Sequence, residues 1–232
     1  MDSIDNMMAM FDSIAENLKY EKICSLSPEL KKEYDRLLNK LIEVNSSSAS
    51  TREKGKALEE ISFFLLKNCG IFDVYGNVRT STNELDQLVR VNEKGKLLKS
   101  KCIIDSRLEH FIGECKNYQS KVSVTFVGKL CSLLITTQNK IGTLFSYKGI
   151  SGNSWDNSKG LIKKFYLSKE KENERFCIID FNINDFISIK EGNNLLQIIS
   201  DKILSLQNDT SYSFFITPHA GTEDILKMQV KN

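Results

Sequence analysis

The sequence is poor in proline and glycine. It contains 2 prolines and 12 glycines among 232 residues. Chains that remain disordered are typically rich in these residues, so the shortage argues against a largely disordered protein. Apolar residues make up 41% and charged residues 27% of the chain, as in an ordinary globular protein. The length suits one large domain, or one domain with a small appendage.

Histidine and closely spaced cysteine pairs are also scarce. The chain has 2 histidines, His110 and His219, and 6 cysteines without any CxxC pair. This pattern predicts neither a zinc finger nor a disulfide scaffold. We expect reduced thiols, as in a cytoplasmic protein, that serve mostly as small core residues. Because His219 has no partner at a metal-binding spacing, we expect it at the surface. The cysteines are Cys24, Cys69, Cys102, Cys115, Cys131 and Cys177.

Long hydrophobic runs and an excess of one charge are missing as well. No apolar run is long enough to span a bilayer, and the first residues, MDSIDNMMAMFDS, lack the basic stretch of a signal peptide. We therefore expect a cytoplasmic protein with no membrane partner. The net charge is +2, from 32 basic and 30 acidic side chains, so composition alone does not indicate a nucleic-acid binder.

Two helices are predicted in the first part of the chain. Apolar residues at helical spacing indicate a helix over Asp5–Leu18. Ser27 and Pro28 are typical of the start of a second helix, which ends in the polar run NSSSAST, Asn45–Thr51. This run is the only low-complexity stretch and the best candidate linker. The clustered Met7, Met8 and Met10 suit either a partner helix or a seam within the domain.

The linker divides the chain into three parts. We predict an N-terminal helical segment over 1–50, a main domain over 51–210 and a tail over 211–232. The main domain follows the order α-β-β-β-α-β-α-β-α-α, which is typical of an α/β domain with a mixed sheet flanked by helices. Its first three strands are expected to be antiparallel, with the charged stretch 93–101 as the loop of an extended hairpin. The predicted helices are 52–69, 122–140, 154–173, 183–192 and 195–207, and the strands are 72–80, 83–92, one ending near 114, 141–147 and 175–181.

A charged pair interrupts the third predicted strand. Glu114 and Lys116 are two residues apart, so on a strand they point to the same face. A solvated sheet surface explains this pair, and so does an active site. Asp86 interrupts an apolar run on the neighbouring strand, and strand pairing would bring the two acids together. Two nearby carboxylates suit Mg²⁺, and a lysine beside them can orient water or offset negative charge. Such a set suits the hydrolysis of a phosphodiester.

The same residues carry a resemblance to a known family. The segments GKALEEISFFLL, RTSTNELDQLV, FIGECKNYQSKVSVTFVGKL and GTLFSYKGISG resemble the PD-(D/E)xK superfamily, more narrowly the Mrr-like restriction endonucleases. The match covers roughly Glu53 to Leu206. In that family a Gly-x-x-x-Glu helix start precedes an Asp on the second strand and a Glu-x-Lys on the third. Gly55 and Glu59 fit the first element.

Asp86, Glu114 and Lys116 fit the remaining elements of the family pattern. The resemblance implies a restriction-endonuclease-like core and a Mg²⁺-dependent endonuclease that acts on DNA and leaves 5′-phosphates, with Mn²⁺ able to substitute. It assigns the metal to Asp86, Glu114 and the backbone carbonyl of Cys115, nucleophile assistance to Lys116, and a supporting role to Glu59. By analogy it suggests defence against phage or foreign DNA, as a homodimer or with a partner protein of a defence system.

The chain also departs from the family pattern, and other readings stay open. Leu85 stands where the family has a proline, and the interval from Asp86 to Glu114 is longer than usual. One alternative is a catalytically inactive nucleic-acid-binding or regulatory subunit with the same fold. A weaker one is an interaction module without any nucleic-acid role.

Three further side chains are assigned to substrate binding on weaker grounds. Gln119 falls where related enzymes often carry a polar residue, and Lys121 and Lys148 lie near the predicted site in sequence, within reach of a phosphate backbone. The stretch 149–152, GISG, suits either a phosphate cradle or a simple flexible turn. Trp155 suits either stacking on a base or anchoring of the following helix.

Overall fold

The computed structural model describes residues 6, 9, 13, 19–79, 84–152 and 157–208. Several predictions fall outside these residues. They are most of the helix predicted over 5–18, the methionine cluster, Trp155, His219 and the tail 211–232.

A five-stranded mixed sheet forms the centre of the protein, with the strands in chain order from β1 to β5. The first three strands are antiparallel neighbours, as predicted, and β3, β4 and β5 are parallel. Every residue of β4 is buried, as expected of a central strand in the parallel part of a sheet. The strands are β1 (Phe72–Arg79), β2 (Glu84–Val91), β3 (His110–Lys116), β4 (Ile141–Ser146) and β5 (Cys177–Phe181).

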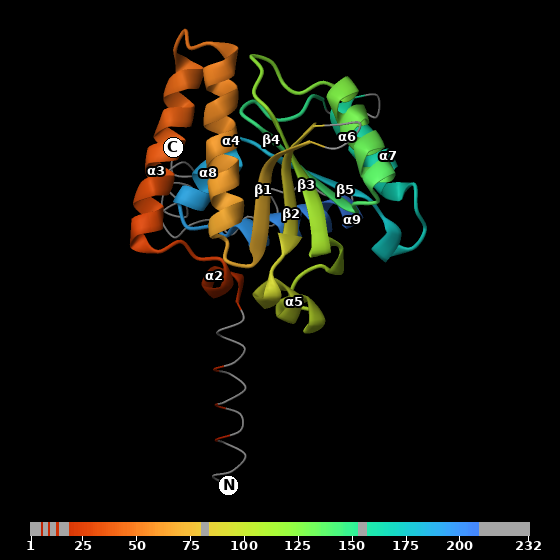
Figure 1. Cartoon of the computed structure of the whole chain (residues 1–232). Helices are drawn as coiled ribbons and strands as arrows, with labels where there is room; N and C mark the ends of the chain where they lie inside the picture. Colours follow the sequence, from red (N-terminus) through yellow and green to blue (C-terminus); the bar gives the residue numbers. More distant parts are fainter. Residues whose placement is uncertain are drawn as a thin grey trace, which may run out of the picture.

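Helices cover both faces of the sheet, which confirms the predicted α/β class with a mixed sheet. Figure 1 shows α3 and α4 side by side on one side of the sheet and α6 and α7 on the other. The helices are α2 (Tyr20–Ile23), α3 (Pro28–Ser46), α4 (Thr51–Asn68), α5 (Glu93–Ser100), α6 (Val124–Thr137), α7 (Ser158–Leu167), α8 (Ile183–Lys190) and α9 (Leu195–Asn208). Two short 3₁₀ helices span Ser106–Glu109 and Glu172–Glu174.

Two apolar clusters fill the space on either side of the sheet. Along β3, Phe111 and Cys115 belong to the cluster under α3, α4, α8 and α9, whereas Ile112 belongs to the cluster under α6 and α7. Successive strand residues point to opposite faces. Glu114 and Lys116 therefore share the face of Ile112, at the end of the strand where the apolar residues stop.

The starts of α3 and α4 follow their sequence signals. Ser27 Oγ accepts a hydrogen bond from the Leu30 N–H at 3.3 Å, and Ser50 and Glu53 form a reciprocal capping box. The predicted linker is a short turn between the two helices. Tyr34 of α3 is buried and donates a hydrogen bond to the Phe186 carbonyl at 2.7 Å, so α3 packs into the same core as the sheet.

The charged stretch 93–101 is not the loop of an extended hairpin. Its first eight residues form α5, which Asn92 caps by accepting a hydrogen bond from the Gly95 N–H at 3.1 Å. Lysine, leucine and glutamate are good helix formers, and Leu98 is buried. Gly95 is required here, because a Cβ at this position would lie 2.5 Å from the Ile71 carbonyl oxygen. Local helix propensity and a specific close approach therefore override the predicted loop.

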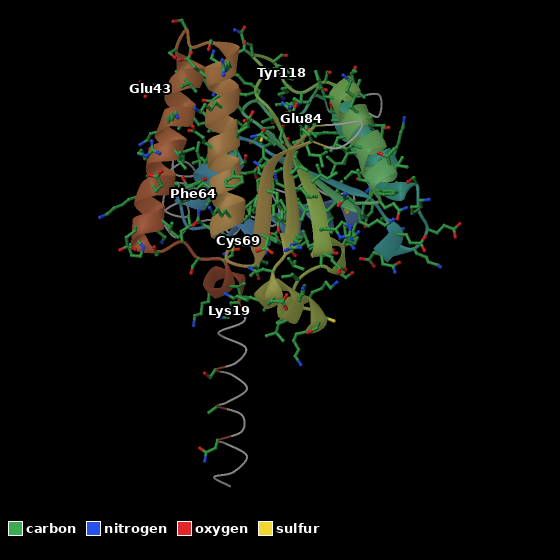
Figure 2. All side chains as sticks on the ribbon, viewed as in Figure 1. Lys19, Glu43, Phe64, Cys69, Glu84 and Tyr118 are labelled. Carbon is green, nitrogen blue, oxygen red and sulfur yellow. A yellow bond between two sulfur atoms is a disulfide. The ribbon has the colours of Figure 1, made fainter. Side chains whose placement is uncertain are left out.

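The cysteines are not all reduced, contrary to expectation. Cys24 and Cys69 form a disulfide that joins the chain before α3 to the end of α4. In Figure 2, Cys69 lies at the opposite end of the sheet from Tyr118. The two cysteines are 45 positions apart in the sequence, so their pairing depends on how α3 and α4 pack and carries no local signal. Three other cysteines are buried free thiols, as predicted: Cys115, Cys131 and Cys177. The free thiol of Cys102 is exposed.

Among the described residues, no helix combines the length and the apolar character needed to cross a membrane.

Candidate active site

The candidate site lies where β3 ends, at the carboxyl edge of the parallel strands. The ladder between β2 and β3 pairs Gln87 with Gly113. The next step of an antiparallel register sets Asp86 against Glu114. Tyr118, two residues beyond β3, marks this end of the sheet in Figure 2. Strand register therefore brings together two acids that are 28 positions apart in the sequence.

The Lys116 ammonium lies among three oxygen atoms. Its Nζ forms an ion pair with Glu114 Oε1, lies 3.6 Å from Asp86 Oδ2 and donates a hydrogen bond to the Cys115 carbonyl at 3.1 Å. These three residues are the ones that the family resemblance assigns to a metal ion. The side chains of Asp86, Glu114 and Lys116 keep 20%, 19% and 23% of their surface exposed, so solvent reaches the site.

Asp86 is held in place by the backbone of the neighbouring strand. Its Oδ2 accepts a hydrogen bond from the Cys115 N–H at 2.7 Å. On the other side, the register places Asn77 of β1 opposite Asp86, but this pair is missing between two registered pairs. Asn77 has a φ of 51°, in the left-handed region that asparagine tolerates. The ladder is thus interrupted beside the residue that faces the site.

The charges at the site have opposing effects on the pKa values of Glu114 and Lys116. Burial raises the pKa of Glu114, and the charge of Asp86 raises it further, so that the Lys116 ion pair does not bring it back to its ordinary range. Burial alone would lower the pKa of Lys116, but its hydrogen bond to Glu114 and the charges of Glu114 and Asp86 raise it. The ammonium therefore stays charged at neutral pH, while the two acids repel each other.

Glu59 of α4 approaches this cluster from the helix. Burial raises the pKa of Glu59, the charge of Asp86 raises it further, and Lys116 acts to lower it. These interactions place Glu59 within electrostatic range of both residues. Within the described chain its carboxylate makes no hydrogen bond or ion pair. Its neighbour Glu60 points elsewhere and pairs with Lys40 of α3 at 2.6 Å.

A buried polar cluster supports the strands from behind. Cys115 Sγ lies 3.2 Å from Ser62 Oγ, and Gln87 Nε2 donates a hydrogen bond to Ser62 Oγ at 2.6 Å. Burial raises the pKa of the Cys115 thiol far above its usual range, so the thiol is neutral and only its backbone carbonyl suits a metal. Sequence reasoning missed Ser62 and Gln87. The one sequence signal for this cluster is the glycine at position 113, because a glycine inside a strand often marks a close approach. A Cβ at Gly113 would lie 2.5 Å from Gln87 Oε1.

The start of α4 is tied to the end of β3. Asn117 Nδ2 donates a hydrogen bond to the Lys54 carbonyl in the first turn of α4 at 2.7 Å. The next residue is Gly55, and a Cβ built there meets no atom within 4 Å. Internal packing therefore does not explain this glycine.

The three weaker substrate-binding candidates are all exposed, but they differ in how they are placed. Lys121 and Lys148 lie in two loops that a bridge between Val122 and Ile150 joins, so both lie at the edge of the sheet that holds the site. Gln119 lies in the first of these loops and, among the described residues, makes no hydrogen bond to the acids or to Lys116.

The turn 149–152 has its own structural explanation. Gly149 and Gly152 have φ values of 74° and 86°, which favour glycine. The hydroxyl groups of Ser151 and Ser158 lie 2.7 Å apart, and Ser158 Oγ donates to the Val122 carbonyl at 2.9 Å. These contacts account for the turn, and the reading as a phosphate cradle stays a prediction.

The donor atoms around Lys116 fit a hard divalent cation. Two carboxylates and a backbone carbonyl are oxygen ligands of the kind that Mg²⁺ and Mn²⁺ take. The described residues contain no group of three or more His, Cys, Asp or Glu side chains that could hold a metal on their own. At this site the third oxygen comes from the backbone of Cys115.

No family model matches the sequence, and the curated proteins contain no match to it either. The relation to the PD-(D/E)xK superfamily therefore rests on the motifs described above and stays a prediction.

Proposed function

We propose that the protein is a Mg²⁺-dependent endonuclease that hydrolyses phosphodiester bonds of DNA. The observation that supports this proposal most directly is the arrangement around Lys116. Asp86, Glu114 and the Cys115 carbonyl all direct an oxygen atom at one positively charged group. These oxygens come from two strands, and a solvated sheet face would not need to gather them around one ammonium.

In this proposal Asp86, Glu114 and the Cys115 carbonyl hold the metal ion. The ion supplies Lewis-acid polarisation of the phosphoryl oxygen and lowers the pKa of water. The carboxylates must be ionised to bind it, and the raised pKa of Glu114 makes that binding sensitive to acid.

Lys116 acts as a hydrogen-bond donor, because its raised pKa keeps it protonated at neutral pH. A protonated lysine cannot take a proton from water. It can orient the attacking water and stabilise negative charge that develops on the phosphate oxygens. Glu59 is better suited to accept the proton of that water, because its raised pKa makes its carboxylate a stronger base than an ordinary one.

The DNA backbone would approach along the edge that carries Lys121, Lys148 and the first turns of α4. Lysines at this edge can neutralise phosphates. Gly55 presents backbone without a side chain on the same helix as Glu59, and the protein itself leaves that space open. A defence role, with a second copy or a partner protein that supplies specificity, is part of this proposal by analogy alone.

One observation favours the alternative of an inactive binding subunit. Lys116 already forms ion pairs with both acids, so the fold does not need a metal ion to keep them together. Such a subunit would bind nucleic acid in a salt-dependent way without cutting it.

The test is an incubation of the purified protein with plasmid DNA, and separately with RNA, in Mg²⁺, Mn²⁺ or EDTA. Asp86→Asn and Lys116→Met are compared with Glu60→Gln, a control that removes a carboxylate on α4 outside the site. We expect metal-dependent cutting of DNA by the wild type and the control and none by the other two. Binding without cutting would support the inactive subunit. The absence of both binding and cutting would overturn both interpretations.

A further inference from the structure

Ser146 is a buried hydroxyl beside Lys116. It ends β4, is 1% exposed, and its Oγ has no hydrogen-bond partner among the described residues. The ladder between β3 and β4 sets Ser146 directly against Lys116. Side chains of paired residues on adjacent strands point to the same face and lie close together. The hydroxyl therefore lies next to the lysine side chain, on the face that carries Glu114.

An unsatisfied buried hydroxyl costs stability, so its presence calls for an explanation. The Lys116 ammonium does not use it, because Nζ is engaged by Glu114, Asp86 and the Cys115 carbonyl. These three oxygens are also the proposed metal ligands. Two positive groups cannot share them at such short distances, so a bound cation must displace the ammonium.

We propose that Lys116 is a two-position residue and that Ser146 provides its second position. Without metal, the ammonium pairs with Asp86 and Glu114 and offsets part of their negative charge. When a divalent cation takes these oxygens, the ammonium turns to Ser146 Oγ, which accepts its hydrogen bond. Lys116 thereby competes with the metal, and Ser146 reduces the cost of displacing it. This inference rests on the proposed function, because it takes the metal ligands from it.

The test measures Mn²⁺ affinity calorimetrically, without nucleic acid, on the full chain purified free of metal. The variants are Lys116→Met, Ser146→Ala and the double variant, with Lys67→Met as a control on α4 outside the site and Glu114→Gln to show that binding occurs there. We expect Lys116→Met to bind Mn²⁺ about tenfold more tightly than the wild type. Ser146→Ala should bind it about threefold more weakly. In the Lys116→Met background the serine substitution should have no effect.

A second readout needs no metal. In EDTA, Lys116→Met should unfold at a lower temperature than the wild type, because two carboxylates lose their counter-ion. Ser146→Ala should unfold at the same temperature as the wild type or higher, since it removes an unsatisfied group.

Equal affinity of the wild type and Lys116→Met would overturn the displacement. An equal weakening by Ser146→Ala in both backgrounds would overturn the role of Ser146 and indicate a structural one. Metal-dependent plasmid cutting together with either result would leave the proposed function standing. Failure of every variant to bind Mn²⁺, with no cutting, would remove the proposed function and this inference together.

Discussion

Two acid–base pairs with the same spacing differ sharply in this protein. Asp105 and Arg107 are two residues apart, as are Glu114 and Lys116, and both pairs are partly buried. Burial acts to raise the pKa of Asp105, but three hydrogen bonds from Arg107 lower it below its ordinary value. The pKa of Glu114 is raised despite its ion pair. We call Asp105 and Arg107 the satisfied pair, because the base lowers the pKa of its acid. We call Glu114 and Lys116 the opposed pair, because the pKa of the acid stays raised.

The difference in pKa between the two acids comes from the number of carboxylates that each base pairs with. Arg107 has one carboxylate, which it meets with two donor nitrogens in fork geometry, and its remaining nitrogen reaches the Glu172 carbonyl. Lys116 serves Glu114 and Asp86 and has Glu59 nearby. Excess negative charge at a partly buried site is typical of a functional site rather than a stabilising one. Spacing alone does not distinguish the two cases.

The largest expected effect tests the satisfied pair. Asp105→Asn should lower the free energy of unfolding by roughly 3 kcal/mol, because it leaves a nearly buried guanidinium without its counter-ion. Arg107 keeps only 4% of its side chain exposed. Urea unfolding in EDTA gives the value. Asp73→Asn is the matched control, since its bond to Arg90 is exposed and should contribute less than about 1 kcal/mol. Equal losses in both variants would contradict the comparison.

The second prediction concerns the opposed pair. Asp86→Asn should reduce the rate of metal-dependent plasmid cutting by at least about a hundredfold, because it removes a metal ligand. It should not destabilise the metal-free protein as Asp105→Asn does, because removing one of two like charges relieves repulsion. Initial cutting rates and urea unfolding are measured on the same preparations. A large loss of stability would show that Asp86 is a structural residue like Asp105.

The pH dependence of stability should have opposite signs for the two pairs. A raised pKa means that the folded state favours the protonated acid, so the stability that Glu114 contributes is present at low pH and is lost as pH rises through its folded pKa. A lowered pKa means that Asp105 contributes stability above its unfolded pKa and loses it as pH falls through its folded pKa.

Glu114→Gln should therefore gain stability relative to the wild type as pH rises from about 4 to 7. Asp105→Asn should lose stability relative to the wild type as pH rises to about 4, the ordinary pKa of an aspartate, and should stay level above it. Urea unfolding in EDTA from about pH 3 to pH 7 gives both slopes. Parallel slopes would show that the two acids do not differ in the way proposed.

Much of the fold was predictable because it depends on local patterns. The cap at Ser27, the buried run of β4 and the alternation on β3 are all visible in a few residues. The same alternation, with the pairing of neighbouring strands, predicted that Asp86 and Glu114 would lie close together. That the two acids bind a metal ion stays a prediction.

What could not be predicted depends on contacts between distant segments. The helix α5 has local signals in its cap and its helix-forming residues, but the close approach of Gly95 to Ile71 depends on the packed fold. The cluster of Ser62 and Gln87 joins a helix to a strand, and neither residue stands out by type or spacing. The orphaned hydroxyl of Ser146 is visible only when every neighbouring donor and acceptor is known.

The smallest expected effect separates stability from function at the start of α4. Gly55→Ala should stabilise the protein by up to about 1 kcal/mol, because alanine is the better helix former and its Cβ meets no atom within 4 Å. If the DNA backbone passes over this turn, the same methyl group should weaken DNA binding. Thermal unfolding and a binding titration in Ca²⁺ check the two effects. Gly128→Ala on α6 is the matched control, because its Cβ also fits, with the nearest atom at 3.8 Å. A variant that is more stable and binds DNA normally would mean that the glycine serves neither packing nor substrate, and the proposed path of the DNA would have to move away from α4.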